Sequence, residues 1–229
     1  MIKAVLFDLD QTLLDIDGDA FLEAYVEALA AFMAPLVNPA DFRQALWSAS
    51  VAALTEDHPE RTNHAVVWHA LGTQLGVATD RLETHAMAFN AADLRVICPG
   101  GSPKPGAHDA VRSAQQHGLA IAVATTPIYD VSVIRERLRR AELATVGWDV
   151  IANDQFYTTK PHPSYFLELA QRLGVAPTEC LMVGDDYFAD LPARKVGMAT
   201  FYVGPPLRGV NLGPTGTLLD LPRHLRDLA

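Results

Sequence analysis

The chain is poor in the features that mark secreted and membrane proteins. It has only two cysteines, Cys98 and Cys180, which form neither a Cys-x-x-Cys motif nor a disulfide framework, and this favours a reducing compartment. No apolar run reaches the roughly 18 residues that a membrane span needs. The longest candidate, Ala28 to Val37, is interrupted by Pro35. The first residues lack the apolar stretch and cleavage site of a signal peptide. We therefore expect a cytoplasmic protein without membrane association.

Positive charge is scarce as well. The net charge of -9 argues against a nucleic-acid-binding surface. The segment from Ile16 to Asp93 contains eleven acidic residues, three arginines and no lysine. That segment would repel a highly anionic group, so a ligand beside it should have a neutral or cationic organic part. The eight histidines are scattered, and none pairs with a cysteine or glutamate at zinc spacing, so we expect no zinc site.

Hydrophobic periodicity divides the 229 residues into two kinds of segment. Ile2 to Leu9 reads as a buried strand, whereas Ala20 to about Ala92 has helical spacing, broken by prolines into about four helices. A linker from Pro99 to Gly106 follows. Beyond it, strands and helices alternate as far as Val203, with helices at 131–140, 163–173 and 191–196 and a strand at 180–184 among them. This alternation predicts a parallel sheet with helices on both faces. We expect an α/β core, residues 1–15 and 98–229, that carries an all-α insert, residues 16–97.

Polar side chains follow the predicted strands, at the edge where open α/β sheets bind ligands. Four successive strand ends carry such residues: first Asp8 and Asp10, then Thr125 and Thr126, then Lys160, and finally the acidic group Asp185, Asp186 and Asp190. Asp8 and Asp10 are two positions apart, so they share a face if the strand geometry persists. Clustered carboxylates favour a hard cation such as Mg²⁺, and a lysine with a hydroxyl would complete a phosphoryl site.

Structural explanations exist for each of these positions. Asp8 could cap a helix, Asp10 could be a solvated turn residue, and Lys160 could be a loop lysine. Thr125 and Thr126 could satisfy backbone groups. Asp190 could cap the helix that begins at Leu191, which does not exclude an additional role near a metal.

The four motifs, in this order, resemble the signature motifs of the haloacid dehalogenase superfamily. The resemblance covers Ile2 to about Val203 and implies a Rossmann-like core. The helical insert resembles the cap of the subfamily whose cap follows the first motif. This likeness implies a Mg²⁺-dependent phosphatase that hydrolyses a small phosphorylated metabolite through an aspartyl-phosphate intermediate.

The resemblance also implies a role for each motif residue. Asp8 matches the nucleophile, and Asp10 matches the general acid/base, whose backbone carbonyl would touch Mg²⁺. Thr125 and Lys160 match the groups that bind and neutralise the phosphoryl group, with Thr126 contributing through its amide. Asp185 matches the acidic metal ligand, and Asp186 or Asp190 would be the secondary acidic member.

One departure from the family pattern is Gln11, which stands where Gly or Asn is common and forces the catalytic turn to tolerate a Cβ atom. Alternative functions on the same scaffold are a phosphomutase, a haloacid dehalogenase or a non-catalytic ligand-binding domain. In dehalogenases of this superfamily the position that matches Asp10 is not an aspartate, so Asp10 argues against that function. A phosphonate hydrolase would need a Schiff-base lysine in the cap, and the segment from Ile16 to Asp93 contains no lysine.

The predicted insert provides two further expectations. The aromatic residues Phe21, Tyr25, Trp47 and Trp68 should pack its helices together. The segment from Leu14 to Asp19 should form the hinge and lid, with Gly18 permitting motion.

Overall fold

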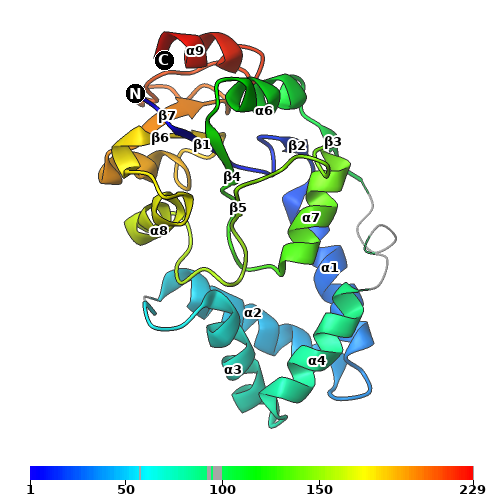
Figure 1. Ribbon diagram of the computed structural model, residues 1–229. Coiled ribbons are helices and arrows are strands. Elements are labelled where there is room, and N and C mark those ends of the chain that lie inside the picture. The colour runs from blue at the N-terminus through cyan, green and yellow to red at the C-terminus, as the bar shows by residue number, and fades with distance from the viewer. Residues whose placement is uncertain (57, 92–93, 95–99, 229) are drawn as a thin grey trace.

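The computed structural model describes residues 1–56, 58–91, 94 and 100–228. An α/β part contains both ends of the chain, and a bundle of four helices lies below it in Figure 1. No helix within the described ranges is both long and apolar enough to cross a membrane. Cys180 is a buried free thiol, whereas Cys98 lies outside the described residues.

The sheet of the α/β part has five parallel strands in the order β5-β4-β1-β6-β7. They are β1 (Ala4–Phe7), β4 (Ala120–Val123), β5 (Val150–Ile151), β6 (Cys180–Gly184) and β7 (Ala199–Tyr202). β1 is the central strand, and all four of its residues are buried. A short apolar run of this kind is typical of a strand covered on both faces. The central position of β1 places the residues that follow it between the ends of β4 and β6.

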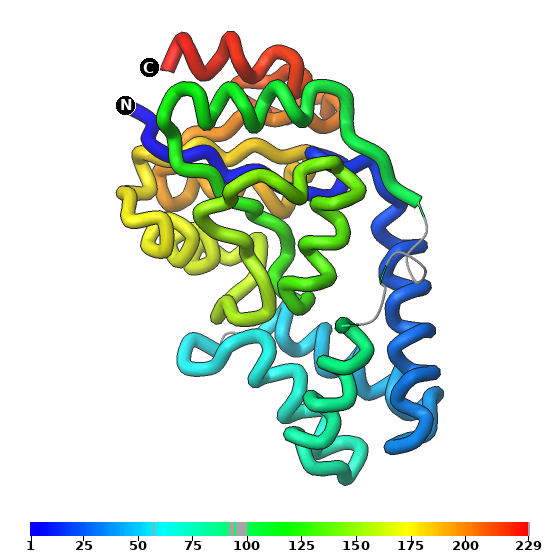
Figure 2. Tube along the Cα trace, turned by 45° about the vertical axis from the view of Figure 1, so that its right-hand side comes forward, coloured from blue at the N-terminus to red at the C-terminus, as the bar shows by residue number. Residues whose placement is uncertain are grey.

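Helices cover the two faces of the sheet (Figures 1 and 2). The helical elements of the α/β part are α6 (Ala107–Gln116), α7 (Val131–Arg140), α8 (Pro163–Leu173), α9 (Leu221–Leu228) and the short 3₁₀ segments η1 (Pro177–Glu179) and η2 (Leu191–Val196). On β1, Val5 and Phe7 join the core cluster that contains residues of α6, α7 and α9. Ala4 and Leu6 join the cluster on α8 instead. This alternation follows from the two-residue period of a strand.

The second part is built from α1 (Gly18–Phe32), α2 (Pro39–Thr55), α3 (Asn63–Leu75) and α4 (Thr79–Asn90). Polar side chains cap three of these helices at their first residues, namely Asp17, Asn38 and Thr62. Phe21 and Tyr25 are buried and stack on one another within α1. Tyr25 packs against Phe89 of α4, as predicted, whereas Phe21 packs against Tyr129 of the α/β part. Trp47 is 66% exposed, so the prediction that it packs the helices together was wrong.

Two short strands connect the four helices to the α/β part. β2 (Leu14–Asp15) pairs antiparallel with β3 (Ser102–Pro103). The sequence predicts only a linker for the second of these segments, because a two-residue strand between glycines and prolines has no periodicity to detect. The backbone of Lys104 also donates a hydrogen bond to the carbonyl of Leu13, which extends this crossing.

Most predicted elements are found where the sequence placed them. The helices predicted at 131–140 and 163–173 and the strand at 180–184 have the predicted bounds. The segment 191–196 is a 3₁₀ helix rather than an α-helix. α6 and α9 were not predicted as helices. The Gly- and Pro-rich tail after Gly204, which the sequence predicts to wrap the core, packs on α6 through the helix α9.

Candidate active site

The predicted site residues meet at the carboxyl ends of the parallel strands. Asp8 follows β1, Thr125 follows β4 and Asp185 follows β6, while Lys160 lies in the loop between β5 and α8. A pocket of about 270 Å³ at this edge is lined by residues of every predicted motif. Its lining includes Asp8, Asp10, Thr125, Thr126, Lys160 and Asp185. The topology therefore brings together the four motifs, as the strand-end argument requires.

A buried lysine joins two carboxylates at the centre of this pocket. Nζ of Lys160 lies 2.7 Å from Oδ1 of Asp8 and 2.7 Å from Oδ1 of Asp190. The side chain of Lys160 is only 3% exposed. Burial disfavours its charge, but the carboxylates of Asp190 and Asp8 outweigh that effect and raise the pKa of Lys160 well above its usual value. The lysine is therefore an ammonium ion, and it is not the solvated loop residue that the sequence also allowed.

Asp190 is fully buried and holds this lysine in place. Its Oδ2 accepts a hydrogen bond of 3.0 Å from the backbone N–H of Asp186, so both of its oxygens are occupied. Burial raises the pKa of Asp190, and the Lys160 ammonium opposes that shift. Asp190 stands at the N-terminus of η2, but its side chain does not cap this 3₁₀ helix. The alternative that Asp190 is a helix cap is therefore wrong.

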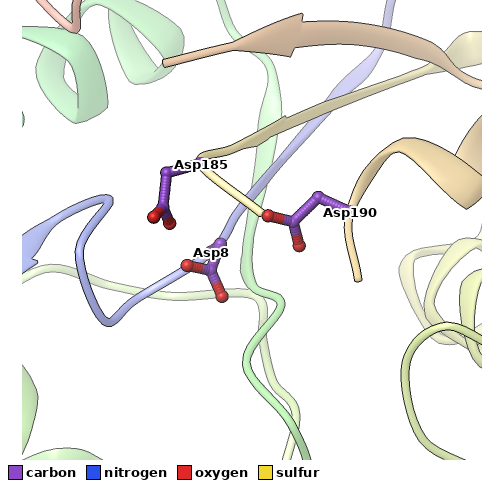
Figure 3. Close-up of side chains that lie close together, drawn as sticks. All are labelled: Asp8, Asp185 and Asp190. Carbon is purple, nitrogen blue, oxygen red and sulfur yellow. The ribbon is translucent and has the colours of Figure 1, made fainter. Parts of the chain in front are cut away.

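Asp8, Asp185 and Asp190 form an acidic cluster, drawn in Figure 3. Each offers one carboxylate oxygen, and these atoms lie within 4.8 Å of one another. Oδ1 of Asp185 accepts a hydrogen bond of 2.8 Å from the hydroxyl of Thr12. Burial, followed by the charge of Asp8, raises the pKa of Asp185 to about 6. A set of oxygen donors with excess negative charge suits a hard divalent cation, so these residues fit a metal site. Both oxygens of Asp190 already accept a hydrogen bond, so Asp8 and Asp185 are the more available ligands for a metal.

The carboxylate of Asp186 makes different contacts from that of its neighbour Asp185. Its Oδ1 accepts hydrogen bonds from the backbone N–H groups of Phe188 and Ala189, at 2.7 and 3.0 Å. The carboxylate thus stabilises the loop that leads from β6 to η2, although the residue also lines the pocket.

Asp10 faces the same pocket but pairs with a residue that the sequence analysis did not single out. Arg137, on α7, donates a hydrogen bond to Oδ2 of Asp10. Arg137 is 2% exposed, and its guanidinium carbon lies 5.3 Å from the ring centre of Phe21 and 4.8 Å from that of Tyr129. Burial raises the pKa of Asp10, and Arg137 counteracts the shift. Oδ1 of Asp10 is buried and has no hydrogen-bond partner among the described residues.

The turn after Asp10 holds a non-glycine residue, Gln11, in a backbone conformation that favours glycine. Gln11 adopts a φ of 61°, in the left-handed region that favours glycine. Its side chain donates to the carbonyl of Ile16, and its Oε1 accepts a hydrogen bond of 3.0 Å from Nζ of Lys104. The turn therefore tolerates a Cβ atom, and the glutamine side chain links it to the segment that precedes α1.

Thr12 and Arg137 are the site residues that sequence reasoning missed. Thr12 belongs to the first motif, but nothing in the sequence paired it with Asp185, because the two are 173 positions apart. For Arg137 a signal was present. It shares a helical face with Ile134 and Leu138, so it places a cation on the apolar side of α7. A charged residue in that position requires a buried partner.

The comparisons with known proteins agree with the geometry. The sequence profile of the haloacid dehalogenase-like hydrolases matches residues 2–196. A phosphoglycolate phosphatase of Xanthomonas campestris is 30% identical over 203 residues, which cover 86% of this chain and 80% of the relative. An N-acetylmuramic acid 6-phosphate phosphatase of Pseudomonas aeruginosa is 28% identical over 239 residues, which cover 99% and 94% of the two chains.

A solved structure supports the fold. The crystal structure of a 2-haloacid dehalogenase from Pseudomonas syringae pv. Tomato DC3000 covers 100% of both chains with a TM-score of 0.65 and 24% sequence identity. The matched profile spans most of the chain and all four motifs. The chain therefore belongs to the family of haloacid dehalogenase-like hydrolases, as its motifs predicted.

Proposed function

We propose that the protein is a Mg²⁺-dependent phosphatase that hydrolyses a small phosphorylated metabolite through an aspartyl-phosphate on Asp8. The observation that carries this proposal is the buried ammonium of Lys160, held 2.7 Å from Oδ1 of Asp8. A carboxylate can accept a phosphoryl group only when its charge is masked, and Lys160 supplies one part of that masking. The two curated relatives described above are both phosphatases by name.

In the first step, a carboxylate oxygen of Asp8 attacks phosphorus and the bond from phosphorus to the leaving oxygen breaks. Asp10 gives its proton to that oxygen, and its unpartnered Oδ1 is the atom available to carry the proton. Thr125 and the backbone amide of Thr126 line the pocket and would bind the phosphoryl oxygens. The alcohol then leaves, and Asp10 is left as a carboxylate.

In the second step, water attacks the phosphorus of the aspartyl-phosphate. Asp10 accepts a proton from that water, and the bond between phosphorus and Asp8 breaks. Inorganic phosphate is released, and both aspartates return to their starting state. One residue thus serves as acid and then as base, which requires it to lie beside the nucleophile. Asp10 meets this requirement because it lines the same pocket as Asp8.

The metal would be held by Asp8, Asp185 and the backbone carbonyl of Asp10. Bound Mg²⁺ would supply positive charge that masks the carboxylates and polarises the phosphoryl group. Thr12 would orient Asp185 through the hydrogen bond to Oδ1. Asp190 would act through Lys160, because both of its oxygens are already engaged.

We also propose that residues 16–97 are a cap over a core of residues 1–15 and 98–229. Phe21, on the first helix of this segment, lines the catalytic pocket, so the helical part reaches the site. The paired strands β2 and β3 would then be the hinge, with Gly18 at the start of α1. The end of the proposed cap, at residue 97, falls outside the described residues.

The test is phosphate release from p-nitrophenyl phosphate with Mg²⁺, after exhaustive chelation and after Mg²⁺ is restored. We expect activity that chelation removes and Mg²⁺ returns. Asp8→Asn should abolish release while the thermal unfolding midpoint holds or rises, because a repelling charge is lost from the acidic cluster. Turnover that survives chelation would contradict the metal assignment, and near-normal turnover by the variant would contradict the nucleophile.

A further inference from the structure

A second cavity, distinct from the catalytic pocket, lies among the helices of the cap. It has a volume of about 230 Å³, and its lining comes from α1, α2, α3 and α4 together with the core loop at Ile128–Asp130. Its wall is mostly apolar and aromatic, with Tyr25, Val67 and Trp68 among the lining side chains. Well-formed apolar cavities with a few polar groups are typical ligand sites, and this one is smaller than the roughly 300–1,000 Å³ of drug-sized sites. It suits a small aromatic or branched aliphatic group.

This cavity opens to solvent through exposed apolar side chains. Trp47 is 66% exposed, Val51 is 40% exposed and Met87 is 69% exposed, and all three line the cavity. Large apolar side chains gathered at a cavity mouth are typical of a binding site for an apolar group. The exposure of Trp47, which the sequence did not predict, has an explanation here.

The polar groups in the wall are mainly hydrogen-bond acceptors and carboxylates. Nδ2 of Asn63 donates to the carbonyls of Pro127 and Thr158, at 2.9 and 3.3 Å, which fixes the orientation of the amide. Its Oδ1 is then a buried acceptor without a partner in the described part of the chain. A buried acceptor of this kind favours a ligand that brings an N–H or O–H donor.

The charges in the wall favour a cation over an anion. The carboxylates of Glu83, Asp130 and Asp154 line the cavity. Against these three carboxylates stand only Arg43 and His64 in the described wall, so the wall is net negative even when His64 is protonated. Arg43 is paired with Glu27, and His64 lies between Asp154 and Glu83. A second anionic group on a ligand would meet these carboxylates without a free cation in the described wall.

The cavity adjoins the catalytic pocket at one residue. Tyr129 lines both spaces. Its ring packs edge-on against Tyr25 of the cavity at 5.6 Å and against Phe21 of the catalytic pocket at 6.2 Å. A turn of the Tyr129 ring would open a passage between the two spaces, and a molecule that placed its phosphate beside Asp8 could then extend its organic part into the cavity.

We propose that this cavity binds the organic part of the substrate, which is a monophosphate ester of an apolar alcohol that carries an amine or another hydrogen-bond donor and no second anionic group. The inference rests on the proposed phosphatase function for the phosphate end, but the binding of the organic end can be measured without turnover. Tyramine and phloretate are suitable probes, because both are phenols with a short side chain and differ in the sign of its charge.

Binding of the two phenols to the full chain is measured by calorimetry. Tyramine should bind at least about tenfold more tightly than phloretate, which corresponds to about 1.4 kcal/mol. Ser50→Trp, which fills the cavity from α2, should weaken tyramine binding by about tenfold or more. Ser48→Trp is the matched control, because Ser48 is exposed on the same helix and outside the cavity lining, and its affinity should stay within about twofold of wild type.

A second variant keeps the test informative if Ser50→Trp does not fold. Glu83→Gln removes one wall charge at nearly constant volume and should reduce the preference for tyramine over phloretate. Glu23→Gln, an exposed position on α1 outside the wall, should leave that preference unchanged. Equal affinity for the two phenols, or tighter binding of phloretate, would overturn the proposed ligand class.

The last measurement connects the cavity to the reaction. Tyramine should lower kcat/KM for its own phosphate ester with an inhibition constant equal to its calorimetric Kd, and that ester should be the better substrate of the two phenol phosphates by kcat/KM. A kcat/KM that saturating tyramine leaves unchanged would overturn the assignment of the cavity to the leaving group. Tyramine binding that is lost in Ser50→Trp, without hydrolysis of any ester, would overturn the proposed phosphatase and leave the cavity as a ligand site.

Discussion

Arg137 donates a hydrogen bond to Asp10 from a fully buried position, across 127 positions of sequence. Its guanidinium lies over the rings of Phe21 and Tyr129, so aromatic side chains and a carboxylate together hold one cation at the edge of the catalytic pocket. Because Oδ2 of Asp10 is engaged by Arg137, the free Oδ1 has a defined position. Arg137 is thus placed to position the proposed general acid without touching the reacting atoms.

Arg137→Met should therefore slow the enzyme in a way that depends on the leaving group. A misplaced acid can cost up to about 100-fold in rate. The loss should be largest for an alkyl phosphate, whose alkoxide needs a proton, and smaller for p-nitrophenyl phosphate. The measurement is the ratio of variant to wild-type single-turnover rates for the two esters. Arg137→Lys keeps a cation and should recover part of the loss. Arg135→Met, at an exposed position of the same helix, should match wild type. Equal losses on both esters would indicate a merely structural role.

Gly184 is required by the side chain that holds the lysine. A Cβ atom at this position would lie 2.0 Å from Oδ2 of Asp190, which is fully buried and cannot retreat. Gly184→Ala should displace Asp190 and release Lys160, so that turnover falls and stability drops by about 1–3 kcal/mol. Gly147→Ala is the matched control, because a Cβ atom there meets nothing within 4 Å. Urea unfolding and phosphate release are measured together. A fully active Gly184→Ala enzyme would exclude a catalytic role for the contact between Asp190 and Lys160.

The choice between Asp185 and Asp186 as metal ligand can be tested without turnover. At a Mg²⁺ concentration of about 100 times Kd, the wild type should gain about 2.7 kcal/mol, or about 5–10 °C in melting temperature. Asp185→Asn should lose this gain. Asp186→Asn should have a lower melting temperature without Mg²⁺, because the carboxylate of Asp186 stabilises a loop. It should still show the full rise in melting temperature when Mg²⁺ is added. Thr12→Val should weaken Mg²⁺ binding about 10–100-fold, since it removes the hydroxyl that orients the carboxylate of Asp185. The opposite pattern for the two aspartates would assign the metal to Asp186.

Sequence reasoning was most successful where local pattern determines structure. The strand at 180–184 and the helices at 131–140 and 163–173 have strong periodicity and clear boundary residues, so their bounds were predicted. The motifs were recognisable because each follows a strand end. The contacts between distant residues were not predictable, since nothing local links Arg137 to Asp10 or Thr12 to Asp185.

The same limit explains the error about Trp47, among helices α1 to α4. An apolar residue such as Trp47 has the same local signal whether it fills a helix interface or the mouth of a cavity. The outcome depends on which side chains of the neighbouring helices contact the residue, and tertiary packing alone determines that. The eight histidines likewise looked uniform in sequence, although one of them joins α3 to the loop between β5 and α8.

That histidine is His64, at the start of α3, and it should make stability depend on pH. Its Nδ1 lies 2.8 Å from Oδ2 of Asp154 in the core, and its Nε2 lies 3.1 Å from Oε1 of Glu83 on α4. The hydrogen bond to Asp154 raises the pKa of His64, and burial opposes the shift. A raised folded-state pKa means that the stabilisation is fully present below the unfolded value of 6.5 and is lost as pH rises through the folded value.

His64→Gln should therefore cost most near pH 6, by about 1–3 kcal/mol for the lost charge-assisted hydrogen bonds, and progressively less at higher pH. Urea unfolding of wild type and variant between about pH 6 and pH 9 measures this difference, in a range where ordinary carboxylates stay ionised. His69→Gln is the control, because His69 lies exposed on the same helix, and its effect on stability should be small. A cost of His64→Gln that is constant or grows with pH would show that the contacts to Asp154 and Glu83 do not depend on the imidazolium, and that the junction of α3 with the core is held by the hydrogen bonds of Asn63 instead.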